Sequence, residues 1–135
     1  MTQAVTRLNP SSLPDSAELG YSQITTVEPG RMAYVSGQVA SRPNGEPVPD
    51  DLVEQTKIVA ANAKAALDAL GAAPEDIVIA RIFMTDLNSD TLEQAFPVLL
   101  DAFDGAQPCI TGVGVAALAG PNLKIEMAMT IRLPD

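Results

Sequence analysis

The sequence predicts a single α+β domain in which two helices pack on one face of a mixed β-sheet. Two observations support this prediction. Segments with apolar residues at helical spacing alternate with short strand-like segments, and their order along the chain is ββαβαββ. The length of 135 residues matches one domain, and an apolar share of 47% is enough to build a core. Residues 1–135 show no internal repeat and no second domain.

The first part of the chain is expected to form an extended lead-in followed by a β-hairpin. Residues 1–19 are mostly polar and form the lead-in. Residues 22–27 and 32–39 are predicted to be strands, and Pro29-Gly30 suits a type II turn between them. Residues 41–49 contain three prolines and predict a long loop.

Asp51 begins the clearest helix. Glu54 follows three residues later, as in a capping box, and Gly71 suits the position just after a helix. Between these ends the apolar residues recur at helical spacing, which predicts one buried stripe. They are Leu52, Val59, Ala63, Ala66, Leu67 and Leu70.

The segment 77–87 is predicted to be a strand with apolar residues on both faces. One face is expected to hold Ile77, Ile79, Phe83 and Leu87, and the other Val78, Ala80, Ile82 and Met84. Two helices can cover only one face of the sheet. We therefore expect another copy of the chain to cover the second face, because large apolar patches usually mark interfaces.

A second helix is predicted near residues 92–103. Pro97 either lies in the first turn of a helix that starts late or kinks a helix that starts early. Residues 109–115 and 123–133 are predicted to be the last two strands. In the final strand the odd-numbered residues are apolar and are expected to face the core.

The charge and the rare residue types exclude several functions. The formal charge is −9, and the eight cations are scattered, so neither nucleic acid nor an anionic membrane is an expected partner. There is no histidine, which excludes triads and histidine acid–base chemistry. Cys109 is the only cysteine, so we expect no intrachain disulfide, no metal site and a cytoplasmic location.

Five short segments, in order over nearly the whole chain, resemble the Rid family, also called the YjgF/YER057c/UK114 family. No single segment is specific, but their order and spacing together are. They are Tyr21-Ser22-Gln23, Ser36-Gly37-Gln38, Glu54-Gln55-Thr56, the Phe-Met-Thr-Asp-Leu-Asn run at 83–88, and the Lys-Ile-Glu-Met-Ala run at 124–128. The resemblance implies a chorismate-mutase-like fold, a homotrimer with clefts between subunits, and cofactor-free hydrolysis of enamines and imines to a keto acid and ammonia.

The same resemblance implies which residues form the site. Tyr21, Ser36, Asn88 and Glu126 correspond to polar residues of the family's cleft. Glu126 and Tyr21 are the candidate catalytic groups, because a carboxylate can direct water at an imine carbon. The other candidates contact the substrate: Ser36, Gly37, Asn88, Cys109, Ile110 and Thr111.

Each candidate also has a structural interpretation. Glu126 can be a solvated residue paired with Lys124 or Arg132, and Asn88 can cap a helix. Tyr21 can anchor a half-buried turn, and Cys109 can be a small buried apolar residue.

Ile110 is the main departure from the family's pattern. Active members carry an arginine in a Pro-x-Arg-Ser/Thr motif, where it clamps the substrate carboxylate; here the segment is Pro108-Cys109-Ile110-Thr111. Loss of one partner from a buried charge pair costs on the order of 2–5 kcal/mol. Arg81 can restore the charge or pair structurally with an acid. Two functions stay open: a hydrolase with a diverged substrate, and a non-catalytic trimer that binds a small ligand or a partner protein.

Overall fold

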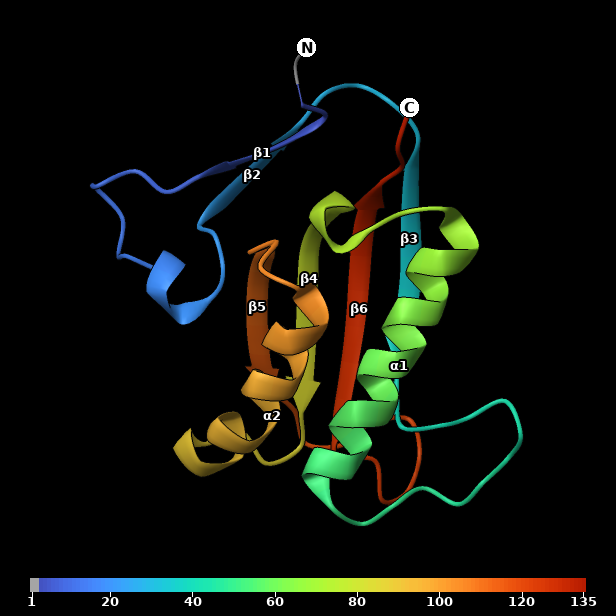
Figure 1. Ribbon diagram of the computed structural model, residues 1–135. Coiled ribbons are helices and arrows are strands. Elements are labelled where there is room, and N and C mark those ends of the chain that lie inside the picture. The colour runs from blue at the N-terminus through green and yellow to red at the C-terminus, as the bar shows by residue number, and fades with distance from the viewer. Residues whose placement is uncertain (1–2) are drawn as a thin grey trace.

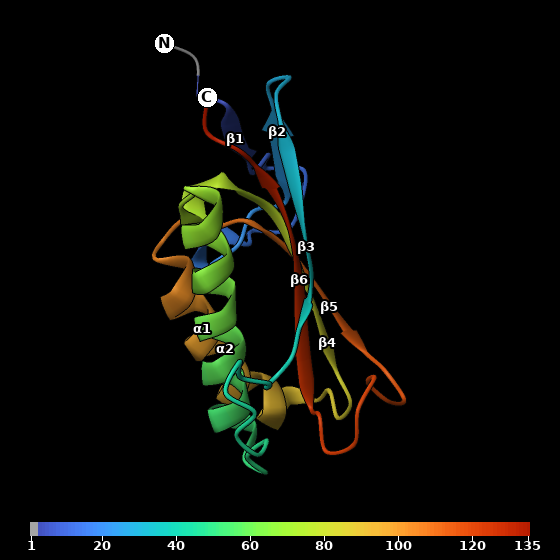
Figure 2. The ribbon, with the colours of Figure 1, turned by 90° about the vertical axis from the view of Figure 1, so that its right-hand side faces the viewer.

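The computed structural model describes residues 3–135, and its centre is a four-stranded mixed sheet. The strands are β3 (Met32–Gln38), β4 (Ile77–Met84), β5 (Cys109–Gly114) and β6 (Ile125–Arg132), in the spatial order β3-β6-β4-β5. Strand β6 is antiparallel to both neighbours, and β5 is parallel to β4. Two helices cover one face of this sheet and leave the other face open (Figures 1 and 2). The predicted α+β class is confirmed.

Helix α1 (Leu52–Leu70) has the predicted ends. The side chain of Asp51 accepts a hydrogen bond from the Glu54 N–H at 3.0 Å, which satisfies one of the free donors at the helix start. Gly71 follows the helix with a φ of 64°, in the left-handed region that glycine adopts without strain. The buried stripe includes the fully covered Val59 and packs toward the sheet.

Helix α2 (Ser89–Phe103) starts three residues earlier than the predicted start near Leu92. Asn88 explains the difference because its side chain accepts from the Thr91 N–H at 3.0 Å and its own N–H donates to Thr91 Oγ1 at 3.0 Å. Pro97 therefore lies inside the helix, where it offers no N–H to the Glu93 carbonyl.

The core lies between the two helices and the sheet. In β6 the alternation is as predicted: Ile125, Met127, Met129 and Ile131 are buried. In β4 the expected faces are partly wrong. A register shift between Ile77 and Ile79 turns Ile77 inward, onto the same buried side as Ala80, Ile82 and Met84.

The predicted hairpin between residues 22–27 and 32–39 is wrong. Strand β2 (Ile24–Val27) pairs with β1 (Val5–Leu8), and β3 pairs with β6 instead. Gly30 does not have the positive φ that a type II turn requires. Its lack of a side chain serves another purpose, because a Cβ at Gly30 would collide with the Arg132 guanidinium.

Residues 3–19 are also more structured than the expected extended lead-in. They contain β1 and a 3-10 helix, η1 (Ala17–Leu19); a second 3-10 helix, η2 (Pro74–Asp76), precedes β4. The start of this lead-in, residues 1 and 2, lies outside the described residues. In Figure 1 the β1–β2 ribbon lies above β5, at the end of the main sheet where the C-terminus also lies.

Two buried polar side chains form hydrogen bonds that hold loops against the core. Gln55 of α1 is fully buried and donates from Nε2 to Pro49 O at 2.8 Å and Asn122 O at 2.7 Å, while its Oε1 accepts from the Lys124 N–H at 2.9 Å. Arg132 is 1% exposed and donates to the backbone oxygens of Glu28 and Pro29. Both side chains join segments that are far apart in sequence.

The uncovered face of the sheet carries several apolar side chains. Ile79 and Phe83 on β4 are only half-buried, Val113 on β5 is exposed, and Tyr34 on β3 is 77% exposed. Within residues 3–135, no helix has the length and apolar character needed to cross a membrane.

Candidate functional site

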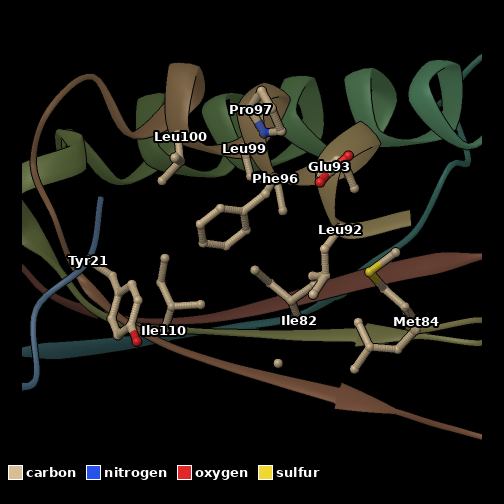
Figure 3. Close-up of a pocket in the computed structure, with 13 residues that line it drawn as sticks. Tyr21, Ile82, Met84, Leu92, Glu93, Phe96, Pro97, Leu99, Leu100 and Ile110 are labelled. Atoms are coloured by element: carbon tan, nitrogen blue, oxygen red, sulfur yellow. The ribbon is translucent and has the colours of Figure 1, made fainter. Parts of the chain in front are cut away.

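A pocket of about 580 Å³ opens between α2 and the β4–β5 edge of the sheet. Its walls are almost entirely apolar, and Figure 3 shows side chains from the helix above facing side chains from the strands below. The helix contributes Leu92, Glu93, Ala95, Phe96, Pro97, Leu99 and Leu100, and the strands and loops contribute Tyr21, Ile82, Met84, Leu87, Ile110 and Gly112.

Tyr21 closes one end of the pocket. Gly20, which ends η1 with a φ of 95°, comes immediately before it. A Cβ at Gly20 would lie 2.7 Å from Leu100 Cδ2, so only glycine lets this segment approach α2 so closely. Figure 3 shows the Tyr21 ring beside Ile110, on the side of the pocket opposite Phe96 and Leu100.

No lysine or arginine is among the described residues that line the pocket. Among the described residues that line it, only Tyr21 and Glu93 have ionisable side chains. Ile110, where the resemblance implies an arginine in active members, lines the pocket and contributes an apolar surface. Glu93 is exposed, so its carboxylate lies at the rim.

Glu126 belongs to a second cluster, on β6 and β3. Ser36 and Gly37 lie where the β3–β6 register shifts between Val35 and Gln38. The Glu126 side chain lies over Gly37, because a Cβ there would collide with Glu126 Oε2 and Cδ. Glycine at this bulge therefore makes the space that the carboxylate occupies.

The expected ion pairs of Glu126 are not formed within residues 3–135. Lys124 Nζ donates to the backbone oxygen of Asp50, and Arg132 forms its ion pair with Asp135. Glu126 is half-buried and takes part in none of the four ion pairs of the described chain. Its carboxylate is thus available to a water molecule or to a neighbouring molecule.

The two clusters lie on opposite faces of the sheet. Ile110 is next to Ala80, and both belong to the face that the helices cover. Glu126 alternates with the buried Ile125 and Met127, so its side chain projects from the uncovered face. One chain alone does not bring Tyr21 and Glu126 together.

Asn88 lies outside the pocket. It is exposed at the start of α2, where it forms the cap described above and also donates to Asp86 Oδ1 at 3.3 Å. Thr111 is next to Arg81 on the uncovered face, and both are exposed. Arg81 is therefore on the wrong face to supply a cation to the pocket of its own chain.

Cys109 sits among residues of the N-terminal ribbon. Its Sγ lies 3.1 Å from Thr25 Oγ1, which also accepts a hydrogen bond from Arg7 at 2.9 Å. Burial lowers the pKa of Arg7, and the nearby Cys109 and Asp76 partly offset this effect. The half-buried thiol is thus tied to β2 rather than directed into the pocket.

Glu93, Phe96 and Leu100 were not among the site residues predicted from the sequence, yet all three line the pocket. The spacing of residues along α2 could have indicated this side of the helix. Glu93 and Pro97 are one turn apart, as are Leu92 and Phe96, so the pocket-facing side of α2 is wider than a core stripe. No three or more Cys, Asp or Glu side chains among residues 3–135 form a group that could hold a metal ion.

Known proteins share both the sequence pattern and the fold. Residues 12–132 match the family model described as Endoribonuclease L-PSP. The Escherichia coli K12 protein provisionally named reactive intermediate deaminase TdcF is 31% identical over 108 residues, or 78% of this chain and 83% of TdcF. The RutC family protein YjgH of the same organism is 34% identical over 120 residues, covering 88% and 87%.

A solved structure extends this similarity to three dimensions. YyfB from Yersinia pestis, described as a protein of unknown function of the conserved Rid family, superimposes with a TM-score of 0.91 at 34% identity. The match covers 97% of this chain and 100% of YyfB. Together these comparisons give the chain the fold and the sequence pattern of one family.

Proposed function

We propose, because this chain belongs to the Rid (YjgF/YER057c/UK114) family, that it hydrolyses a small imine or enamine to a carbonyl compound and ammonia. The name of TdcF, a reactive intermediate deaminase, supports this reaction class. The observation that carries the proposal is the Glu126 carboxylate, held over Gly37 and free of any ion pair within residues 3–135.

Glu126 is the group we assign to water activation. Its carboxylate accepts a proton as a water molecule adds to the imine carbon, which forms a carbinolamine. With the substrate bound as its protonated imine, return of that proton to the carbinolamine nitrogen makes an ammonium leaving group. The C–N bond then breaks, the hydroxyl proton passes to the departing ammonia, and the carbonyl product and ammonium are released. A placed acid–base group of this kind contributes about 10²–10⁴-fold in rate. Tyr21 supplies a phenol that can hydrogen-bond to the substrate.

The working particle in this proposal is a homotrimer. Tyr21 and Ile110 belong to the covered face of the sheet and Glu126 to the uncovered face, so they can share one cleft only if they come from different chains. Burial of Phe83, Val113 and Tyr34 against another copy would supply the apolar contact that such an interface needs. Ser36 and Gly37 would then line the same cleft as the pocket.

Glu126→Gln tests this assignment. The amide keeps the size of the side chain but accepts no proton at neutral pH, so kcat/KM should fall about 10²-fold or more. The substrate is generated in the assay by an oxidase, and carbonyl release is followed. Glu54→Gln, on an exposed part of α1, is the matched control and should retain the parental rate. An E126Q protein with parental activity would remove Glu126 from the mechanism.

The alternative is a non-catalytic trimer that binds a small ligand or partner protein. The pocket favours it in one respect, because Ile110 removes the cation that would hold an amino-acid-like substrate. The two functions differ in a simple assay: a binder leaves imine hydrolysis at its uncatalysed rate at any protein concentration. Ribonuclease action, which the family model's description names, is disfavoured by the net charge of −9.

A further inference from the structure

The charge of the pocket is the opposite of what a carboxylate ligand requires. A ligand in this pocket meets Ile82, Phe96, Leu99 and other apolar side chains, and the one formal charge at the rim is the negative Glu93. No lysine or arginine of the described chain lines it. The net charge of −9 adds a further unfavourable potential for anions.

A carboxylate placed in the pocket of one chain would lose its water without gaining a partner from that chain. An ionised group that is buried without a counter-ion is among the costliest arrangements in a protein. A protonated amine or iminium of the same size meets a different environment. Its apolar part covers the wall made by α2 and β4, and its charge can remain in water at the rim, on the side of the pocket where Glu93 lies.

We propose that this pocket takes a hydrophobic imine that carries no carboxylate, bound as its iminium ion, with Glu93 as the residue that favours the positive charge. This inference rests on the proposed function and adds the substrate class to it. The volume of about 580 Å³ suits a compact aromatic or branched aliphatic group.

The reaction balances without a cofactor. One iminium ion, R–CH=NH₂⁺, and one water give an aldehyde, R–CHO, and NH₄⁺. The C=N bond is replaced by a C=O bond, and no electrons are gained or lost. The reaction that supplies this substrate is therefore the two-electron oxidation of a hydrophobic primary amine at carbon, rather than the dehydration or oxidation of an amino acid.

Binding of stable probes tests the charge preference directly. Benzylamine, benzyl alcohol and benzoate share one ring and differ in charge, and each is titrated calorimetrically into the parent protein at pH 7. We expect benzylamine to bind at least about tenfold tighter than benzoate, which corresponds to about 1.4 kcal/mol. Equal binding, or tighter binding of benzoate, would overturn the inference.

Two substitutions and one control substitution locate the preference for positive charge. Glu93→Gln should weaken benzylamine by about two- to fivefold, as expected for an exposed ion pair, and leave benzyl alcohol unchanged. Glu54→Gln should leave both unchanged. Ile110→Arg should strengthen benzoate by about tenfold or more, because a guanidinium offers it two parallel hydrogen bonds. If E93Q left the benzylamine-to-benzoate ratio at its parental value, Glu93 would not be the selecting residue.

An activity assay separates failure of this inference from failure of the proposed function. One imine is generated from benzylamine by a flavin amine oxidase, and another from phenylglycine by an amino acid oxidase. Faster hydrolysis of the benzylamine-derived imine alone supports both proposals. Faster hydrolysis of the phenylglycine-derived imine alone keeps the hydrolase but overturns the substrate class. If neither is accelerated while benzylamine still binds in preference to benzoate, hydrolysis is overturned and the preference of the pocket stands.

Discussion

Replacement of Gln55 by methionine should destabilise the protein by about 3 kcal/mol. The side chain is fully buried and makes three hydrogen bonds, to Pro49 O, Asn122 O and the Lys124 N–H. Each contributes about 1 kcal/mol net, and a partner left dry and unpaired costs 1–3 kcal/mol. Methionine has a similar volume and a similar helix propensity, so the change isolates the hydrogen bonds.

Urea unfolding followed by far-ultraviolet circular dichroism measures this loss. With an m-value of about 2 kcal/mol/M, the midpoint should fall by about 1.5 M. All samples are kept at one protein concentration, because the stability of an oligomer depends on it. Glu54→Gln, the neighbouring exposed residue, should move the midpoint by less than about 0.3 M. A Gln55→Met protein within 0.5 kcal/mol of the parent would refute the view that this side chain fastens the two loops.

Further substitutions at two positions, Gly37 and Asn88, test residues near the candidate site. Gly37→Ala should lower kcat/KM by about tenfold or more, because the new Cβ displaces the Glu126 carboxylate. The melting temperature should change little, since the Glu126 side chain is flexible. An unchanged kcat/KM would contradict the placement of Glu126 over Gly37. Asn88→Ala should cost about 1 kcal/mol of stability through loss of the α2 cap, whereas Asn88→Asp should restore it. If Asn88→Asp restores stability and leaves KM at the parental value, the side chain is a cap alone; a raised KM would indicate substrate contact.

Elements that depend on nearby residues were predicted well from the sequence. Helix α1 begins after Asp51 and ends before Gly71, as expected, because both caps act within one turn of the helix. The β6 alternation followed from a two-residue period over eight residues. The start of α2 was missed because the cap at Asn88 followed so closely on a predicted strand that the boundary was ambiguous.

Elements that depend on distant residues were not predictable in the same way. Pro29-Gly30 has the local composition of a tight turn, yet Gly30 is required by the guanidinium of Arg132, about a hundred residues later. Strand β1 is short, and its partner β2 could be recognised only in the folded chain. At the candidate site, only the folded chain shows that Glu93 of α2 lines the same pocket as Ile110 of β5.

Placement of the two clusters on opposite sides of one sheet has a genetic consequence. If a cleft takes its pocket from one chain and its carboxylate from the next, two defective proteins can complement each other. A particle made only of Ile110→Asp chains, or only of Glu126→Gln chains, would be inactive. If equal amounts of the two chains assemble at random, about one cleft in four takes its intact pocket from a Glu126→Gln chain and its intact carboxylate from an Ile110→Asp chain. Mixed particles would therefore recover about a quarter of the parental rate. A cell that carries both damaged copies would then show a partial rather than a complete loss of activity.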